Sequence, residues 1–326
     1  MKILIVKSSA IGDIFQAFYV LEPIKIAYPT AQIDWVVEAP FKDIVTSNPL
    51  IHEAIVIETK KWRKFKNLSS LKETIKKLRQ TKYDFVIDLQ GNIKSGLITL
   101  FTKGVKGGYG WETSPEKVNT FFTSKHTNPI PGQNQRDDYL NIVETTLGRT
   151  LSRPKPEVKL KPFKNVMVCP GSAWPNKQLT DKTLLEFLQL LSPNGYTFHM
   201  VWGSDLERAT CEKIKDNLAN VEIVERRPIP QLGNIMKTMD LVIAMDSMAL
   251  HLAGELKIPT FSLFGPSNGE RYKPLGSFAY AFQGPCPYGR TFERRCPLMR
   301  TCPTGACLHD VKATTIYSYF KDCFEK

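Results

Sequence analysis

The chain has 326 residues, which is long for one compact domain and comfortable for two. With 42% hydrophobic and 23% charged residues, its composition excludes a largely disordered protein. No apolar stretch approaches the roughly 20 residues that a membrane-spanning helix needs, and the apolar run after Met1 is too short for a signal peptide. We therefore expect a soluble, cytoplasmic, two-domain protein.

Short apolar runs alternate with helical patterns through the first half of the chain. Strands are expected at residues 2–6, 33–37, 54–57, 84–87 and 104–109, and helices at 15–27, 41–46, 71–78, 93–101 and 136–147. This alternation is typical of βαβ units around a parallel sheet. It predicts a first domain over residues 1–155.

A stiff linker is predicted at residues 152–162, where three prolines stand among charged residues. The alternation then restarts, with strands expected at 165–169, 196–202, 221–224, 241–244 and 260–264, and helices at 182–191 and 206–217. These elements form a second domain over residues 156–312. A last amphipathic helix at 313–324, within the segment 313–326, is expected to pack back on the first domain.

Two successive α/β halves predict two Rossmann-like domains whose parallel sheets face an interdomain cleft. Ligands of such sheets bind at the carboxyl ends of the strands. The first strand is followed by SSAIGD, in which Asp13 is either a general base in the cleft or only the cap of the next helix. No GxGxxG motif follows this strand, which argues against an ordinary NAD site.

Polar motifs also follow the strands of the second domain. In residues 169–177 (CPGSAWPNK), Ser172 and Lys177 can meet a diphosphate, although a plain turn with a surface lysine has the same pattern. In residues 245–251 (MDSMALH), Asp246 or Ser247 can cap a helix whose first N–H groups bind an anion. His251 is either structural or part of that site, and Glu207 is placed to hold ribose hydroxyls.

Two further segments have unusual compositions. Residues 60–82 carry ten lysines and arginines against one acid, Glu73, which indicates an anionic partner or a solvated basic helix face. Four cysteines lie close together near the end, where either a structural zinc or iron ion or free thiols would fit them. These cysteines are Cys286, Cys296, Cys302 and Cys307.

Together these motifs resemble the heptosyltransferases of glycosyltransferase family 9, most closely the members that add the first heptose. The resemblance covers nearly the whole chain. It rests on residues 3–13 (ILIVKSSAIGD), 34–38 (DWVVE), 61–64 (KWRK), 84–95 (DFVIDLQGNIKS), 105–113 (VKGGYGWET), 202–203 (WG), 246–253 (DSMALHLA) and 264–267 (FGPS).

The resemblance implies a GT-B fold and inverting transfer of L-glycero-D-manno-heptose from ADP-heptose to Kdo-lipid A in the lipopolysaccharide inner core. It places Asp13 on the catalytic base, Lys177 on a diphosphate-contacting lysine and Glu207 on a ribose-binding acid. The other donor-binding positions fall on Ser172, Asp246, Ser247 and His251, and the acceptor-binding positions on Lys61, Arg63 and Lys64.

The partners implied are ADP-heptose, Kdo-lipid A and the anionic inner-membrane surface, with the protein peripherally associated at its cytoplasmic face. No cofactor is expected for catalysis, since no DxD-like metal motif lies near these sites, and no nucleic acid is expected. The chain departs from the family at Met248, where glycine is usual, and at Trp174 and Pro175, where many members have polar residues.

Three rival functions remain open from the sequence. A related GT-B transferase with a later core acceptor, a protein acceptor or another nucleotide sugar would share most of these motifs. A nucleic-acid-binding protein would use residues 60–82, although no recognisable binding motif supports it. A metal-binding redox protein would be built around the four cysteines.

Overall fold

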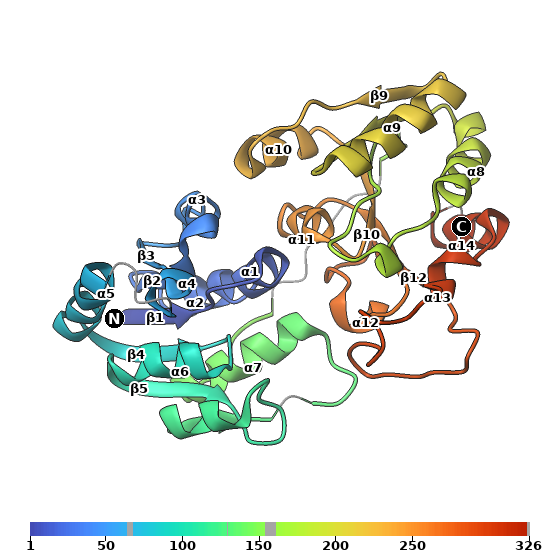
Figure 1. The fold of residues 1–326 in the computed structure, drawn as a ribbon. Helices are drawn as coiled ribbons and strands as arrows, with labels where there is room; N and C mark the ends of the chain where they lie inside the picture. The colour runs from blue at the N-terminus through green and yellow to red at the C-terminus, as the bar shows by residue number, and fades with distance from the viewer. Residues whose placement is uncertain (64–67, 129, 154–160, 325–326) are drawn as a thin grey trace. The chain divides into compact units, whose positions relative to one another are not determined.

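The computed structural model describes residues 1–63, 68–128, 130–153 and 161–324 (Figure 1). The chain divides into two compact units, Met1–Pro154 and Lys155–Lys326, so the division falls within the proline-rich stretch. Each unit contains one six-stranded parallel sheet with helices on its faces. This finding confirms the predicted fold class of two parallel-sheet α/β domains.

The first unit orders its strands β3-β2-β1-β4-β5-β6, so the chain reverses its direction of travel across the sheet between β1 and β4. Such a reversal leaves a crevice at the carboxyl ends of the two strands. The strands are β1 (Lys2–Val6), β2 (Gln32–Glu38), β3 (Glu53–Ile57), β4 (Lys82–Asp88), β5 (Lys103–Tyr109) and β6 (Lys125–Thr127). The helices are α1 (Ile11–Phe18), α2 (Leu21–Ala27), α3 (Lys42–Thr46), α4 (Thr59–Arg63), α5 (Leu68–Gln80), α6 (Ile93–Leu100) and α7 (Gln135–Leu147), with 3-10 turns η1 (Ala39–Phe41) and η2 (Lys117–Phe122).

The single helix predicted at residues 15–27 is wrong, because the structure has two helices there, α1 and α2. Pro23 explains the interruption. Its nitrogen has no hydrogen to donate to the carbonyl of Tyr19, and its ring would clash with that carbonyl in a continuous helix. Helix α1 also begins four residues earlier than predicted, at Ile11, which brings Asp13 into its first turn.

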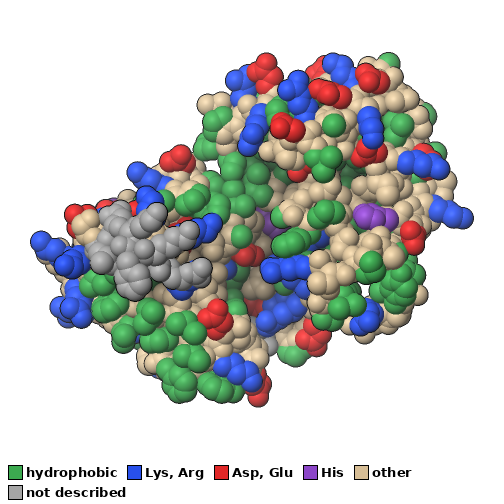
Figure 2. All heavy atoms as spheres, in the orientation of Figure 1, with side chains coloured by type: hydrophobic (Ala, Val, Ile, Leu, Met, Phe, Trp, Pro, Cys, Tyr) green, Lys and Arg blue, Asp and Glu red, His purple; other side chains and the backbone are tan. Residues whose placement is uncertain are grey.

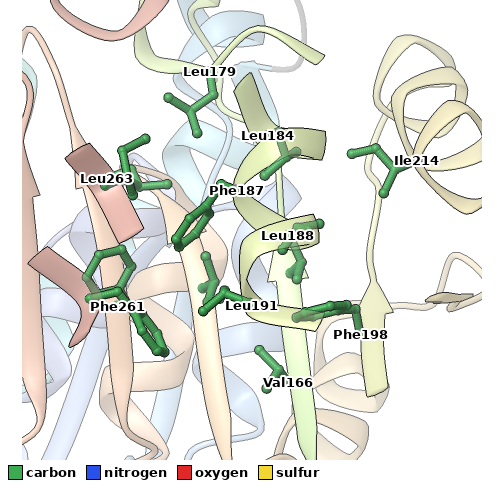
Figure 3. Close-up of a cluster of buried hydrophobic side chains, with 14 of the residues drawn as sticks. Val166, Leu179, Leu184, Phe187, Leu188, Leu191, Phe198, Ile214, Phe261 and Leu263 are labelled. Atoms are coloured by element: carbon green, nitrogen blue, oxygen red, sulfur yellow. The ribbon is translucent and has the colours of Figure 1, made fainter. Parts of the chain in front are cut away.

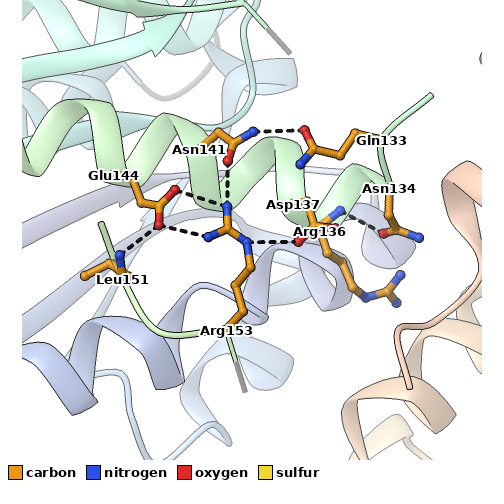
Figure 4. Close-up of polar contacts among 8 residues, drawn as sticks. All are labelled: Gln133, Asn134, Arg136, Asp137, Asn141, Glu144, Leu151 and Arg153. Carbon is orange, nitrogen blue, oxygen red and sulfur yellow. Dashed lines mark hydrogen bonds and ion pairs between the residues drawn. The ribbon is translucent and has the colours of Figure 1, made fainter. Parts of the chain in front are cut away.

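Helices cover both faces of the first sheet, with α1 in contact with α7 and α6 in contact with η2. Right-handed crossovers place these two pairs on opposite faces. The predicted end of α7 is confirmed, since Gly148 terminates it with a left-handed backbone (φ 67°). Beyond it, the Arg153 guanidinium binds Glu144 and Asn141, which ties the end of this unit to α7 (Figure 4).

The second unit repeats the same winding, with strand order β12-β11-β10-β7-β8-β9 and its reversal between β7 and β10. Its strands are β7 (Asn165–Cys169), β8 (Thr197–Met200), β9 (Val221–Ile223), β10 (Leu241–Met245), β11 (Thr260–Phe264) and β12 (Ala279–Gln283). Its helices are α8 (Asp181–Leu191), α9 (Asp205–Asn217), α10 (Ile229–Met236), α11 (Met248–Glu255), α12 (Gly269–Tyr272), α13 (Ala306–His309) and α14 (Ala313–Phe324), with 3-10 turns η3 (Pro175–Lys177) and η4 (Ser192–Asn194).

The core of the second unit lies between its sheet and α8, whose Phe187, Leu188 and Leu191 are fully buried (Figure 3). Helix α14 packs against α8, and its Phe320 ring lies 5.1 Å from the ring of Phe261 on β11. The apolar face that was expected to pack on the first domain is thus covered by the second unit, so that expectation is wrong. The helical spacing predicted the face but carried no information about its partner.

Within the part of the chain that the structure describes, no helix has both the length and the apolar character needed to cross a bilayer.

Candidate functional site

In the first unit, Asp13 lies in the first turn of α1, just after the loop that follows β1. The N-cap residue of α1 is Ala10 and Asp13 is the third helical residue, whose Oδ2 accepts a hydrogen bond from the backbone N–H of Ala10 (3.2 Å), as in a capping box. The carboxylate remains partly exposed at the carboxyl edge of the sheet. This position leaves a second oxygen open to a hydroxyl group, as a general base requires.

The turn after β4 holds this loop in place. The backbone N–H groups of Ser8 and Ser9 donate to Oε1 of Gln90, at 3.0 and 3.1 Å. The turn itself is organised by Asp88, which accepts from Gln90 N–H, Gly91 N–H, the Ser95 hydroxyl and the Asn119 amide. Complete burial raises the pKa of Asp88 despite these hydrogen bonds. Because β1 and β4 are the two strands at the chain reversal, the anchored loop lies at the crevice between them.

Three polar residues near Asp13 had no role in the sequence interpretation. Lys7 is buried directly after β1, with its Nζ 5.3 Å from the centre of the Tyr139 ring. Burial raises the pKa of Tyr109 well above its usual value, and the charge of Asp13 acts in the same direction. The only sequence feature that could have pointed to Lys7 was its position at the end of a buried apolar run.

In the second unit, the structure brings together the residues predicted after β7 and β10. The ammonium of Lys177 lies 2.5 Å from Oδ2 of Asp246, and Nε2 of His251 lies 3.8 Å from Oδ1 of the same carboxylate. All three side chains are at most 10% exposed. The strands β7 and β10 meet at the reversal of this sheet, so this cluster also occupies the position where α/β sheets bind ligands.

The charge state of this cluster follows from its contacts. Burial opposes ionisation of Asp246, yet the charge and hydrogen bond of Lys177, together with the nearby His251, outweigh it and hold the pKa of the carboxyl below its usual range. A charged Asp246 therefore keeps a buried ammonium group at the carboxyl edge of the sheet. Such a cation is suited to binding phosphate oxygens.

The start of α11 adds hydrogen-bond donors to this cation. Ser247 is the N-cap residue, but its hydroxyl does not cap the helix. Its Oγ is buried and has no hydrogen-bond partner among the described residues. The first-turn N–H groups of a helix carry partial positive charge and favour anions. An unpartnered hydroxyl at this helix start, close to the Lys177–Asp246 pair, indicates a place for an anionic ligand.

The loop after β7 is fastened to the neighbouring loops. The Ser172 hydroxyl donates to the backbone oxygen of Asp246 (2.8 Å). The Glu207 carboxylate accepts from Gly203 N–H (2.7 Å) and lies so close to Gly171 that a Cβ added there would be 2.1 Å from it. Ser172 therefore connects this loop to the loop after β10, and Glu207 packs against Gly171 of the same loop.

The cysteine-rich segment packs against the turn that carries Lys177. The Asn176 amide donates to the backbone oxygens of Met299 (3.1 Å) and Cys302 (3.0 Å), and the Arg300 guanidinium lies 4.8 Å from the centre of the Trp174 ring. The departures from the family pattern at Trp174 and Pro175 therefore lie in a turn supported by this segment. The sequence interpretation missed Asn176, because its partners lie more than 120 residues away.

The structure does not support the predicted zinc or iron site. None of the seven cysteines forms a disulfide, and no group of three or more His, Cys, Asp or Glu side chains among the described residues is placed to hold a metal ion. Backbone N–H groups of Thr304 and Gly305 lower the pKa of Cys302, whereas burial raises the pKa of Cys307 to about 11. The neighbouring thiols of Cys286, Cys302 and Cys296 raise the pKa of Cys307 further, so the four thiols lie near one another although no metal-holding group is found among the described residues. These thiols are Cys286, Cys296, Cys302 and Cys307.

The predicted acceptor-binding residues follow β3. Lys61 lies on α4, exposed, with its ammonium 2.5 Å from Glu58 Oε1. The side chain of Arg63 and the whole of Lys64 lie outside the described residues. The Thr59 N–H and hydroxyl both donate to Glu38 at the end of β2, which fixes α4 to the carboxyl edge of the same sheet as Asp13. The role of Lys61, Arg63 and Lys64 in binding the acceptor stays a prediction.

Comparison of the sequence with known families gives one match across both units. The profile of glycosyltransferase family 9 (heptosyltransferase) matches residues 71–301. The chain is also similar to lipopolysaccharide heptosyltransferase 1 of Pseudomonas aeruginosa PAO1, with 27% identity over 90% of each chain.

Solved structures with the same fold include E. coli heptosyltransferase WaaC with ADP, which matches with a TM-score of 0.82 at 21% identity over 99% of each chain. The same enzyme with ADP-2-deoxy-2-fluoro heptose matches with a TM-score of 0.80 over 99% of each chain. These likenesses show that the two parallel-sheet units have the GT-B fold.

Proposed function

This chain belongs to glycosyltransferase family 9, the heptosyltransferases, and we propose that it transfers L-glycero-D-manno-heptose from ADP-heptose to Kdo-lipid A in lipopolysaccharide inner-core biosynthesis. The relative in Pseudomonas aeruginosa is named lipopolysaccharide heptosyltransferase 1. The observation that carries the proposal is the buried Lys177 beside the unpartnered Ser247 hydroxyl at the start of α11.

The second unit would bind the donor. Lys177, Ser172 and the first turn of α11 would hold the diphosphate, since they combine a cation, a hydroxyl and helix N–H groups at one strand edge. The E. coli enzyme has been solved with ADP and with an ADP-heptose analogue, which supports an adenine donor. Glu207 would accept hydrogen bonds from ribose hydroxyls at the neighbouring strand end.

The first unit would supply the base. In one displacement, a Kdo hydroxyl loses its proton to the Asp13 carboxylate and its oxygen bonds to the anomeric carbon of heptose. The bond from that carbon to the diphosphate breaks on the opposite face, so the configuration inverts and ADP leaves. Lys177 and the start of α11 would stabilise the negative charge that develops on the diphosphate. This sequence of steps uses side chains and backbone of the chain alone.

The acceptor side would be basic. Lys61, Arg63 and Lys64 would meet the carboxylates and phosphates of Kdo-lipid A at the edge that carries Asp13. The basic segment of residues 60–82 would add attraction to the anionic face of the inner membrane, worth about 1 kcal/mol for each lysine near the surface. Added salt should weaken both attractions by screening.

ADP release by the purified protein tests the proposal. It should require both ADP-heptose and Kdo-lipid A, and UDP- or GDP-sugars should not replace the donor. Release with a different nucleotide sugar alone would contradict the heptose assignment. Release with ADP-heptose that responds only to an already heptosylated core, or to a protein, would move the enzyme to a later or different acceptor.

Asp13→Asn tests the base. Asparagine retains an oxygen for the Ala10 N–H, so the start of α1 is preserved while the proton acceptor is lost. We expect turnover to fall by about 10²–10⁴-fold, the usual contribution of a positioned general base. ADP binding should be unchanged, because it involves the second unit. Near-normal turnover by this variant would refute the role of Asp13.

A further inference from the structure

Six large apolar side chains lie exposed on one part of the first unit, and none has a role in the proposed reaction. Phe121 is 75% exposed, and Trp111 and Leu100 are each 51% exposed. On α6 the exposed residues recur at helical spacing, so they form one outward stripe. We call the set the apolar patch; it consists of Ile93, Leu97, Leu100, Trp111, Val118 and Phe121.

The patch is continuous because α6 and η2 pack closely. Gly96 of α6 faces Phe122 of η2 so tightly that an added Cβ would lie 2.2 Å from the ring. The rings of Trp111 and Phe121 meet edge to face with their centres 5.9 Å apart. Figure 2 shows hydrophobic side chains gathered over this part of the first unit, at the lower left of the view. Large exposed apolar patches mark interaction surfaces in soluble proteins.

Cationic groups border the patch and indicate what it contacts. Lys94, Lys103, Lys117 and Lys125 are exposed, against two acids, Glu112 and Glu116, in residues 93–125. The Lys117 ammonium lies 5.6 Å from the centre of the Trp111 ring. Where α6 ends, the Arg79 guanidinium of α5 lies 5.3 Å from the centre of the Phe101 ring, so the basic segment of residues 60–82 continues this border.

Lysines around exposed tryptophan, phenylalanine and leucine fit an anionic bilayer. Apolar side chains enter the interface, aromatic rings settle at headgroup level and ammonium groups meet lipid phosphates. A second copy of the same face fits less well, since it would set lysines against lysines. The charge complementarity therefore selects a lipid surface as the occupant.

The patch begins at the edge of the sheet that carries Asp13. Helix α6 starts at Ile93, three residues after Gln90, whose side chain holds the loop before Asp13. The backbone N–H of Ile93 donates a hydrogen bond to the carboxylate of Glu116, the residue directly before η2. We propose that the apolar patch docks the enzyme on an anionic bilayer, so that the sugar end of a lipid-anchored acceptor reaches Asp13. This inference rests on the proposed function for the acceptor alone.

Vesicle flotation tests the docking directly, with vesicles of phosphatidylethanolamine and phosphatidylglycerol. The double variant Leu97→Ser, Phe121→Ser should bind about tenfold or more weakly, because two apolar side chains no longer enter the lipid. Ile26→Ser is the matched control, since Ile26 is 57% exposed on α2 and lies outside the patch. It should bind as the wild type does. Equal losses in both variants, or no loss in the double variant, would overturn the proposal.

Quenching by brominated lipids provides a second readout without loss of binding. Trp111 fluorescence should be quenched in the wild type, and the quenched component should disappear in Trp111→Phe. If the wild type showed no such quenching, or bound equally well to vesicles of phosphatidylcholine alone, the proposal that the patch binds an anionic bilayer would be wrong. A dimer seen in sedimentation and abolished by the double variant would also contradict that proposal. Flotation needs neither donor nor acceptor, so its result can be interpreted even if the transfer assay fails.

Discussion

Two lysine–aspartate pairs of the second unit differ in how far water reaches them. The Lys177 and Asp246 side chains are 9% and 10% exposed, whereas those of Lys213 and Asp181 are 70% and 39% exposed. An exposed pair stabilises a protein by at most about 1 kcal/mol, but removal of one partner from a buried pair leaves an uncompensated charge. Similar chemistry thus has different energetic consequences in the two places.

Asp246→Asn should lower the free energy of unfolding by about 3 kcal/mol or more, because Lys177 is left buried without an opposite charge. Asp181→Asn should lower it by about 1 kcal/mol or less. Urea unfolding followed by tryptophan fluorescence measures both. If both variants lost the same free energy of unfolding, Lys177 would be accessible to water in solution and not buried.

Acid should reduce the difference between the wild type and Asp246→Asn. The pKa of Asp246 lies below its usual range, so its charge stabilises the fold above pH of about 3.9, the unfolded value. That stabilisation is lost as the pH falls through the lowered pKa. A difference that stays constant as the pH falls well below about 3.9 and through the lowered pKa of Asp246 would contradict ionised Asp246 as its source.

The site residues could be predicted from the sequence where a motif directly follows a strand. Asp246, Lys177 and Ser172 lie together in the structure because the loops after β7 and β10 are neighbours at the sheet edge. The supporting residues could not be predicted. Gln90 acts on Ser8 and Asn176 acts on Cys302, across 82 and 126 residues of chain, and no local pattern records such contacts.

At the scale of elements, the turn between β4 and α6 works as a brace for the loop between β1 and α1. Two backbone N–H groups of that loop, from Ser8 and Ser9, converge on Oε1 of Gln90. Gln90 touches no proposed substrate group, so it is a positioning residue. Its loss would let the loop shift, and a misplacement of about 1 Å can lower a rate about 10²-fold.

Gln90→Ala should therefore lower kcat by about tenfold or more and leave the affinity for ADP unchanged. Gln90→Glu is the control, since its carboxylate keeps an acceptor for both N–H groups and should restore most of the rate. Steady-state kinetics with ADP titration separates these effects. Equal activity of the alanine and glutamate variants would show that the brace does not set the position of Asp13.

Elements with strong apolar periods were predictable, and weak ones were not. Strand β1 has the predicted bounds, because a run of buried aliphatic residues marks it. Strand β6 was missed, since its three residues, Lys-His-Thr, have no apolar residue and pair only at the sheet edge. Strand β12 was missed as well, although it is apolar, because it lies between turns with no helical pattern after it.

At the scale of the whole molecule, the two units have separate cores. Buried residues of β1, β2 and β4 cluster within the first unit, and those of β7, β10, α8 and α14 cluster within the second. The repeated α/β alternation made this division predictable. The partner of the last helix was not predictable, because an apolar face specifies burial without specifying the surface that covers it.

ADP should stabilise the second unit selectively, if the donor site lies there. At a concentration of about 100 times its Kd, a ligand adds about 2.7 kcal/mol of stability to the unit that binds it, which raises Tm by roughly 5–10 °C for a unit of this size. Calorimetry should show one shifted and one unshifted transition, with the shift abolished by Lys177→Ala. Equal shifts of both transitions would contradict a donor site confined to the second unit.

The place of α14 in the second core has a consequence for synthesis on the ribosome. Every strand of the first sheet has been made by residue 127, and α7 completes its cover by residue 147. The sheet of the second unit is finished at Gln283, yet Phe187 and Phe261 still lack Phe320, which packs against both. Domains generally fold as they emerge, from the N-terminus onward. The first unit is thus free to fold during translation, while the nascent second unit keeps an uncovered aromatic surface, open to chaperones, until residues 313–324 leave the exit tunnel.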